Sequence, residues 1–417
     1  MKVLHLSARD IEGGAARAAY RLHRGLLNYD VYSRMHVQFK CDVDPLISGL
    51  EGRIGRFFAE ISYLADSIPV FYSRYKRGNT FSPAILPDRV IRHVEMIAPD
   101  IIHLHWISGG FIRLETIPAL KYPIVWTFHD MWPFTGGCHF SGECIRYSGS
   151  CGLCPELSSK REDDLSRKIW RRKAHAWQEL PLTIIVPSLW MAQCVRMSSL
   201  FSQVETNVIP NCIDIKIFRP QSALKAREIL GLPCDRQLIL FGAMSPRDPR
   251  KGFRHLLPAI KDLVKNGWGE TTELIIFGTD KSRTKPDFGM KAYYMGHVCD
   301  EHTMALLYTA ADVFVAPSIQ DNLPNTVMEA LACGTPVVAF NTGGMPEMID
   351  HRETGWLAHP FDYRDIAKGI IHVIEDVERR EIMGRLAREK VVRNYAEDIV
   401  IRQHMKLYDS LVGQLRI

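Results

Sequence analysis

Short apolar runs alternate with longer amphipathic stretches along almost the whole chain. An apolar run of four to eight residues without polar alternation predicts a strand buried on both faces. Because such strands alternate here with helical patterns, the chain is expected to form parallel sheets with helices on both faces. The predicted strands are KVLHLS, IIHLHW, PIVWTFH and LTIIVPS in the first half, and QLILFGA, ELIIFG, ADVFVAPS and TPVVAF in the second.

One stretch, VIPNCIDIKIFRP at residues 208–220, interrupts this series. It has a proline near each end, turn-forming Asn and Asp residues and no clear period, which is typical of a linker. The pattern therefore predicts two α/β domains, an N-terminal one over residues 1–207 and a C-terminal one over residues 208–395. A last helix over residues 396–417 is expected to pack back on the first domain. A length of 417 residues agrees with this division.

Composition and charge narrow the class of protein. Hydrophobic residues make up 46% and charged residues 24% of the chain, which is ordinary for a globular protein. A net charge of +5 is small for this length, so no nucleic-acid partner is expected. No apolar run reaches the roughly 18–20 residues of a membrane span. The start, MKVLHLSARD, indicates a first strand rather than a signal peptide, so a cytoplasmic location is expected.

The ten cysteines include a cluster in CHFSGECIRYSGSCGLCP. In a reducing compartment, clustered cysteines indicate metal binding more than disulfides. Four thiolates within seventeen residues can close a tetrahedral zinc site that stiffens a loop. The last two cysteines have C-x2-C spacing but the first two lie further apart, so free thiols are the alternative. The four residues are Cys138, Cys144, Cys151 and Cys154.

Two stretches combine aromatic and basic residues as membrane-surface helices do. Residues 53–77 predict either a hairpin that touches a membrane or a helix that lines a cleft. In residues 166–177, Trp170 and Trp177 lie seven positions apart on one helix face. Because the preceding KREDD makes this second stretch mixed in charge, inward packing of its tryptophans is favoured over membrane contact. From these stretches we therefore expect a peripheral association with the inner face of the membrane.

The stretch DNLPNTVMEALACGTPVVAF, residues 321–340, follows a predicted strand with a turn and a helix. Pro324 suits the first helical position, Asn322 can cap the helix, and Gly334 suits the position after its end. The helix then begins at the carboxyl edge of a parallel sheet, where free backbone N–H groups can face an anion. Glu329 lies inside this helix, and its alternative interpretation is a surface glutamate on a capped helix.

The longer stretch PSIQDNLPNTVMEALACGTPVVAFNTGGMPEMI, followed by ETGWLA, resembles the donor-site signature of family-4 retaining glycosyltransferases of the GT-B fold. The resemblance extends in order to LFGAMSPRDPRKGF, to YYMGHVCDEHTMALLYTAADVFVAPS and to the predicted linker. It implies an α/β fold of two facing, doubly wound Rossmann-like domains with a cleft between them. The variant residue is Asp321, where the family more often has Glu.

The resemblance also implies roles for individual residues. Glu329 would bind the ribose hydroxyls of a nucleotide and Asp321 the hydroxyls of the donor sugar. Lys251 would bind the diphosphate. The family's usual Arg position is Ala243, so Arg247 or Arg250 is expected to complete the phosphate clamp. The remaining donor-binding residues are expected to be Val298 near the base, and Asn322, Leu323, Pro324 and Asn325, whose backbone would hold the sugar and the distal phosphate.

Two stretches of the first domain are expected to contribute to the same site. In SARDIEGGAARAAYRLHRGL, Gly13 and Gly14 let the backbone approach a ligand at a helix start, so Gly14 is a candidate donor contact. In VWTFHDMWPFTGGC, His129 directly follows a strand and can bind the donor sugar or orient the acceptor hydroxyl. A structural histidine is the alternative. The buried strand IIHLHW predicts that at least one of His103 and His105 is a hydrogen-bonded core residue.

The resulting expectation is a retaining, metal-independent hexosyltransferase with His129, Asp321 and Lys251 in catalysis. Its donor would be a nucleotide diphosphate sugar. Its acceptor would be a glycan or a polyprenyl-diphosphate-linked oligosaccharide in bacterial exopolysaccharide, capsule or O-antigen assembly. No catalytic cofactor is expected, only a structural zinc ion. The alternatives are a non-catalytic sugar-binding scaffold and an epimerase or phosphorylase of the same fold. A dinucleotide oxidoreductase is disfavoured because no G-x-G-x-x-G follows a strand.

Overall fold

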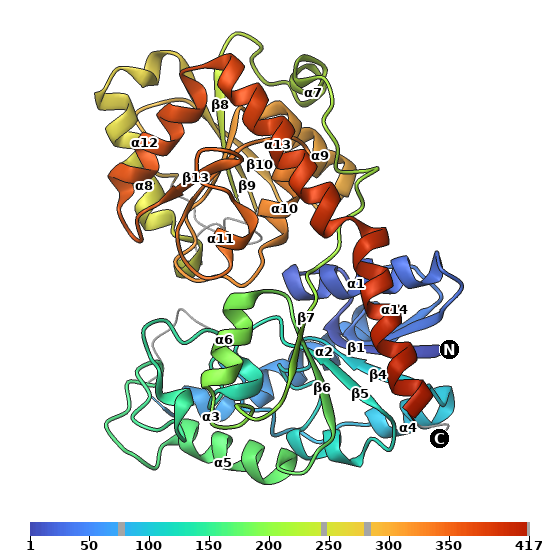
Figure 1. Ribbon diagram of the computed structural model, residues 1–417. Helices are drawn as coiled ribbons and strands as arrows, with labels where there is room; N and C mark the ends of the chain where they lie inside the picture. The colour runs from blue at the N-terminus through green and yellow to red at the C-terminus, as the bar shows by residue number, and fades with distance from the viewer. Residues whose placement is uncertain (74–79, 243–247, 279–284, 415–417) are drawn as a thin grey trace. The chain divides into compact units, whose positions relative to one another are not determined.

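The structure is a computed structural model that describes residues 1–73, 80–242, 248–278 and 285–414. It consists of two compact α/β units, each built on a parallel sheet (Figure 1). The first unit comprises Met1–Cys212 and Val400–Ile417, and the second comprises Ile213–Ile399. The first unit thus extends to residue 212 rather than 207.

The first unit has a seven-stranded sheet in which every neighbouring pair is parallel. Its strands, in sheet order, are β3 (Ile47–Leu50), β2 (Tyr32–Phe39), β1 (Lys2–Arg9), β4 (Ile101–Leu104), β5 (Ile124–Thr127), β6 (Leu182–Val186) and β7 (Thr206–Val208). Its helices are α1 (Gly14–Leu27), α2 (Gly52–Asp66), α3 (Ile68–Phe71), α4 (Val90–Ile97), α5 (Leu165–Trp177), α6 (Leu189–Met197) and most of α14 (Glu397–Gln414).

Alternating residues of the strands supply two separate cores. Val3 of β1 faces α1 and α14, where it packs with Leu22 and Tyr408. Leu4 faces the opposite side, in a core that includes Val94 of α4. This alternation follows from the two-residue period of a strand, and burial on both sides explains why β1, β4, β5 and β6 are apolar runs.

The second unit has a six-stranded parallel sheet. Its strands, in sheet order, are β10 (Ala292–Gly296), β9 (Thr272–Phe277), β8 (Gln237–Gly242), β11 (Val313–Ala316), β12 (Val337–Phe340) and β13 (Gly355–Ala358). Its helices are α7 (Ala223–Leu230), α8 (Phe253–Lys265), α9 (Glu301–Ala310), α10 (Asn325–Ala332), α11 (Met345–Met348), α12 (Tyr363–Ile374) and α13 (Val377–Tyr395).

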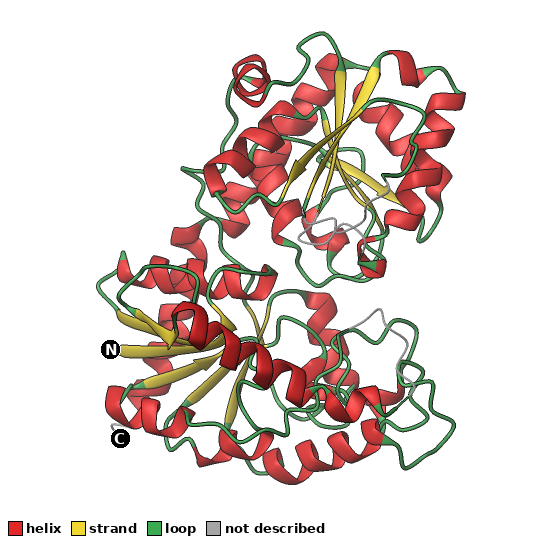
Figure 2. Cartoon of the chain, turned by 180° about the vertical axis from the view of Figure 1, so that it is seen from behind, coloured by secondary structure: helices red, strands yellow, loops and turns green. Residues whose placement is uncertain are grey.

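Helices cover both faces of the second sheet, as Figure 2 shows with strands in yellow and helices in red. One core lies between the sheet and α9, α10 and α11, and includes Leu240 and Val327. The other lies between the sheet and α8 and α12, and includes Ile239 and Ile370. The sheet is therefore doubly wound, and its loops at the carboxyl ends of the strands are available to bind a ligand.

All eight strands expected from apolar runs are confirmed, with slightly different ends. Five others were not expected, namely β2, β3, β7, β10 and β13. In the part of the chain that the structure describes, no helix combines the length and apolar character needed to cross a membrane.

Candidate active site

In the second unit, loops from three neighbouring strands meet at the carboxyl edge of the sheet. The loop after β8 accepts a hydrogen bond at the carbonyl oxygen of Arg250 from the N–H of Ile319, which follows β11 (2.8 Å). The loop after β12 donates from the N–H of Gly344 to the carbonyl oxygen of Asp321 (3.1 Å). These backbone contacts hold the candidate donor-binding segments together.

Lys251 and Asp321 form an ion pair at this edge. Lys251 Nζ lies 2.6 Å from Asp321 Oδ2, and the two side chains are 25% and 13% exposed. Arg250 forms a separate ion pair with Asp248, whose other oxygen accepts the Arg250 N–H. The structure thus brings together Lys251 and Asp321, two residues that the resemblance assigns to the diphosphate and the sugar.

Two glycines allow the close approach of these loops. Gly252 has φ 71°, and a Cβ atom there would lie 1.7 Å from the carbonyl oxygen of Pro317. Gly343 has φ 58°, and a Cβ atom there would lie 2.1 Å from the carbonyl oxygen of Asp321. No side chain fits at either position, so glycine is required for the loops to pack as they do.

The helix α10 begins one residue later than the sequence predicted. Pro324 is the N-cap, with extended backbone at φ −68° and ψ 122°, rather than the first helical residue. Asn322, the predicted capping residue, lies two positions before this N-cap. The predicted end is confirmed: Gly334 has φ 77°, and the N–H groups of Gly334 and Thr335 bond to the carbonyls of Leu331 and Ala330.

Glu329 is fully buried, so the alternative of a surface glutamate is wrong. Its Oε2 atom accepts a hydrogen bond from the hydroxyl of Tyr308 on α9 (3.0 Å), and Tyr308 is itself fully buried. Burial, together with the negative charge of Glu329, raises the pKa of the neighbouring Cys333 thiol. A buried carboxylate costs free energy unless it is hydrogen-bonded, and Tyr308 supplies such a bond here. The sequence interpretation missed Tyr308.

The other candidate donor-binding residues lie around this pair. The residues Asn322, Leu323 and Asn325 are buried, at 4%, 5% and 8% exposed. Val298, in the loop after β10, packs against the core that contains Leu323. Arg247, like Ala243, lies outside the described residues.

In the first unit, the loop after β1 opens α1 as expected. Gly13 is the N-cap with φ 101°, and Gly14 is the first helical residue. A Cβ atom built at either glycine meets no atom within 4 Å. Among the described residues, there is therefore open space beside the two glycines at this helix start.

His129 follows β5 and ends a row of imidazoles. Its Nε2 lies 3.1 Å from Nδ1 of His105, whose Nε2 lies 3.0 Å from Nδ1 of His5. Burial lowers the pKa of His129 to about 4, although the charge of Asp130 opposes this. His129 is therefore neutral near pH 7, in the state that can accept one proton and donate another.

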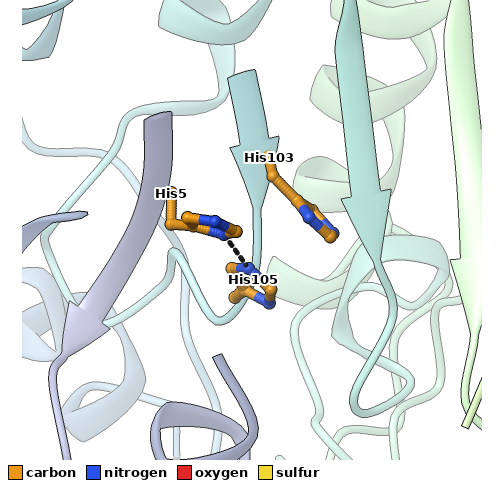
Figure 3. A group of neighbouring side chains, drawn as sticks. All are labelled: His5, His103 and His105. Carbon is orange, nitrogen blue, oxygen red and sulfur yellow. Dashed lines mark hydrogen bonds between the residues drawn. The ribbon is translucent and has the colours of Figure 1, made fainter. Parts of the chain in front are cut away.

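Two histidines of this row, His5 and His105, also form a compact buried group with His103 (Figure 3). One ring nitrogen of each lies within 4.8 Å of the others, the spacing of metal ligands. His103, however, already bonds the hydroxyls of Tyr408 (2.6 Å) and Thr127 (2.7 Å). Because both nitrogens of His103 and of His105 have partners, the group is best described as a hydrogen-bonded core. This confirms the prediction for the strand IIHLHW.

A second polar group lies beside His129. Asp130 Oδ2 lies 2.7 Å from His139 Nδ1 and accepts from Trp106 Nε1 (2.9 Å). Burial would raise the pKa of Asp130, but His139 and hydrogen bonds from Trp132 and Trp106 outweigh it and lower the pKa. The sequence interpretation did not pair Asp130 with His139, although both flank the strand end.

The four clustered cysteines line one small cavity of about 20 Å³. Burial raises the pKa of Cys138 well above its usual range, that of Cys151 to about 12 and that of Cys154 to about 11. Without a cation, these thiols are therefore neutral. No three of the four described sulfur atoms come within 4.8 Å of one another.

The apolar stretch after β3 is exposed. In α2, only Ala59 and Asp66 are buried, and Ile54 and Phe57 are 75% and 58% exposed. Trp177 of α5, by contrast, is 5% exposed within the core, so the expected inward packing of α5 is confirmed for that residue. The exposed apolar side chains of α2 and the following segment are Ile54, Phe57, Phe58, Ile61, Tyr63, Leu64, Ile68, Phe71 and Tyr72.

Family models match both halves of the chain. A model described as "Glycosyltransferase Family 4" matches residues 13–217, and one described as "Glycosyl transferases group 1" matches residues 235–376. The sulfoquinovosyl transferase SQD2 of Arabidopsis thaliana is 37% identical over 374 residues, which cover 82% of this chain and 67% of that protein. A D-inositol 3-phosphate glycosyltransferase of Paenarthrobacter aurescens is 32% identical, over 69% of this chain and 67% of that protein.

The chain spans between about half and two thirds of the length of the curated relatives it matches first.

Among solved structures, sucrose-phosphate synthase from Thermosynechococcus elongatus is similar with a TM-score of 0.73 at 19% identity, over 99% of this chain and all of that one. Anabaena Alr3699/HepE, solved in complex with UDP, is similar with a TM-score of 0.66 at 17% identity, over 98% of this chain and all of that one.

Proposed function

Because the chain belongs to the glycosyltransferases of family 4 and group 1, with a two-domain GT-B fold, we propose that it is a retaining hexosyltransferase. Its donor is a nucleotide diphosphate sugar. Its acceptor is a hydroxyl of a glycan or lipid-linked oligosaccharide in bacterial polysaccharide assembly. The observation that carries the proposal is the Lys251–Asp321 pair at the same sheet edge as the start of α10, the helix that contains buried Glu329.

The ion pair between Lys251 and Asp321 suits a site in which each residue exchanges the other for a group of the bound donor. A donor diphosphate offers Lys251 an anionic oxygen in place of the Asp321 carboxylate. Asp321, released from Lys251, then accepts hydrogen bonds from sugar hydroxyls. In the free chain each charge neutralises the other, so neither is left unpaired in a partly buried site.

Catalysis then consists mainly of stabilising the leaving group. Negative charge develops on the nucleotide diphosphate as its bond to the sugar breaks, and Lys251 provides a fixed cation there. Arg250, which lies one residue away, is held by Asp248 and is the described candidate for a second cation. With these cations the reaction needs no metal ion. Retention follows from attack on the face that the diphosphate leaves, with the diphosphate accepting the acceptor's proton.

The exposed apolar face of α2 and α3 supports a lipid-linked acceptor. Contiguous exposed apolar side chains are uncommon on isolated proteins and mark interaction surfaces. Arg53 and Arg56 are exposed on α2 beside Phe57 and Phe58, a combination suited to an anionic membrane surface. We assign this face to peripheral membrane contact, where a polyprenyl-diphosphate carrier would be found.

The solved structure titled WaaG is described as a glycosyltransferase involved in lipopolysaccharide biosynthesis, and HepE is described in complex with UDP-glucose. These descriptions support the choice of donor and pathway. The names of the curated relatives suggest other acceptors, such as a phosphorylated inositol. A panel of acceptors must therefore include an inositol phosphate.

The test is binding and turnover of a nucleotide-sugar panel with EDTA present. Wild type should bind one donor selectively and release nucleotide diphosphate only when an acceptor is added. Glu329→Gln, which keeps the size of the buried side chain, should lose donor binding while remaining folded by circular dichroism. Donor binding without turnover on any acceptor would support a scaffold instead. Release of product without an acceptor would support a different enzyme of the same fold.

A further inference from the structure

We infer that Cys138, Cys144, Cys151 and Cys154 bind one structural zinc ion in the loop that follows β5. All four side chains line the same cavity, which is about 20 Å³ in volume. One cavity is thus common to all four residues, so they form a single cluster rather than two separate pairs. The cavity has room for one small ion or water molecule.

The backbone around the C-x2-C pair forms a tight, left-handed turn. Cys151, Gly152 and Leu153 have φ values of 54°, 89° and 46°, which residues other than glycine rarely adopt. The turn is anchored by Gly152 N–H to Ser166 Oγ (2.9 Å) and Cys154 N–H to Asp164 Oδ2 (2.8 Å). Strained backbone of this kind persists where its surroundings fix it, and both cysteines of the turn line the same cavity.

Backbone N–H groups lie close to two of the cysteines. Those of Glu156 and Leu157 favour the thiolate form of Cys154, and that of Gly136 favours the thiolate form of Cys151. A neutral thiol is a weak acceptor, whereas a metal-bound thiolate is a strong one. Hydrogen bonds to the ligands are the usual outer shell of a metal site.

The surroundings also supply positive charge. Four thiolates around Zn²⁺ carry a net charge of −2, which a buried site must balance. The side chain of Lys173 on α5 is fully buried and donates to the carbonyl of Thr135 (3.0 Å). Burial lowers its pKa to about 7, and negative charge on Cys138 and Cys151 acts in the opposite direction, towards the ammonium form. Arg167 donates to the carbonyl of Cys151 (3.0 Å).

Zinc suits this donor set, and the site would be structural. Four sulfur ligands favour tetrahedral zinc or an iron–sulfur cluster, and the cavity is small for a cluster. Four cysteines leave no open position for catalysis. The sulfur atoms are further apart than ligands of a single ion, so binding would contract the loop onto the cavity.

Zinc bound by the four cysteines would fix the loop that follows β5. Cys138 precedes His139, which pairs with Asp130, and the N–H of Met131 bonds to the carbonyl of His139 (2.9 Å). Zinc bound at Cys138 would therefore hold the segment next to His129. It would order this segment whatever donor or acceptor the enzyme uses.

The test is the metal content of the full chain purified without chelator. Elemental analysis should find about one zinc per chain. A mercurial reagent should release the zinc as it reacts with four thiols that are protected in the zinc-bound chain. Reconstitution with Co²⁺ should give the absorption of thiolate-to-cobalt charge transfer. Iron with a visible chromophore, or a folded chain that contains no metal and does not take up zinc, would overturn the inference.

Two variants make the test specific. Cys154→Ser should lose the zinc, whereas Cys194→Ser should keep it, although both residues are 7% exposed in the same core. If Cys154→Ser does not fold, Cys144→Ser, at a more exposed ligand, should still lower zinc affinity at least about tenfold. Full zinc retention in both ligand variants would contradict the site. Because metal content is measured without substrate, this result is independent of the proposed transfer reaction.

Discussion

Lys251 Nζ donates a 2.6 Å hydrogen bond to Asp321 Oδ2, and the two residues are 70 positions apart in the chain. Each comes from a loop at the carboxyl end of a strand, β8 and β11, which are neighbours in the sheet. The pair therefore depends on the sheet order, and it links the proposed diphosphate contact to the proposed sugar contact.

Lys251→Ala should weaken binding of the nucleotide diphosphate about 10- to 100-fold, because a charge-assisted hydrogen bond is lost. Isothermal titration calorimetry with the donor selected from the panel measures this. Lys261→Ala, at an exposed lysine of α8, is the matched control and should bind as wild type does. Equal affinity of the two variants would place the diphosphate elsewhere.

Tyr308→Phe should destabilise the second unit by about 1–3 kcal/mol, because the buried Glu329 carboxylate loses a hydrogen-bond donor. Urea unfolding followed by circular dichroism measures the change in the free energy of unfolding. Tyr72→Phe removes the same hydroxyl from a residue that is 88% exposed and should change little. A similar small effect of Tyr308→Phe would mean that Glu329 does not depend on this bond.

Gly252→Ala should disrupt the donor site, whereas Gly231→Ala should not. Both glycines have left-handed backbone, with φ 71° and 67°, so both substitutions carry a strain of roughly 1–2 kcal/mol. Only at Gly252 would the Cβ atom collide with the carbonyl of Pro317, while at Gly231 it meets no atom within 4 Å. Thermal unfolding and donor binding should therefore separate the two variants, and identical results would show that the close approach is dispensable.

Stability should fall as the pH is lowered from about 6.5 to 4. His404, which is 4% exposed, has its pKa lowered by burial to about 4, so the folded chain keeps it neutral where the unfolded chain binds a proton. The contribution, up to roughly 3 kcal/mol, is present above pH 6.5 and lost as the pH approaches 4. Urea unfolding across this range should show a shallower pH dependence for His404→Gln than for wild type. The same change at exposed His175 should leave the slope unaltered.

Binding to anionic vesicles should require the apolar face of α2. Phe57→Glu with Phe58→Glu replaces two exposed rings by charges that a negative surface repels, so co-sedimentation should fall at least about tenfold. Ile229→Glu, at a residue of α7 that is 68% exposed, is the control and should sediment as wild type does. If wild type does not sediment with anionic vesicles, the face serves another partner.

The strands that could be predicted from the sequence are those buried on both faces, because such strands contain few polar residues and form apolar runs. β11 reads VFVA and β12 reads VVAF, and all of these residues are buried. β2 reads YSRMHVQF, in which Ser33 is buried against His23 and only alternate positions are apolar, so no run is visible. β7 has three residues and falls beside the predicted linker. Short or half-polar strands depend on their neighbours and leave little local signal.

For the candidate site, the sequence indicated which residues belong to the site but not which side chains they contact. Spacing within one loop was enough to group the four cysteines. The resemblance grouped Lys251 with Asp321, but the burial of Glu329 follows from packing against α9, which no local pattern shows. The imidazole row from His129 to His5 was missed, although His105 directly follows β4 and His5 pairs with His103 of that strand.

The position of α14 imposes an order on folding during synthesis. Val400, Ile401 and Tyr408 complete the core that begins with Val3. A ribosome makes the first sheet early, yet this core stays open until the whole of Ile213–Ile399 has been translated and has had time to fold. The unit whose synthesis begins first is thus the last to close, and until then the apolar face that α14 will cover is a natural binding site for chaperones.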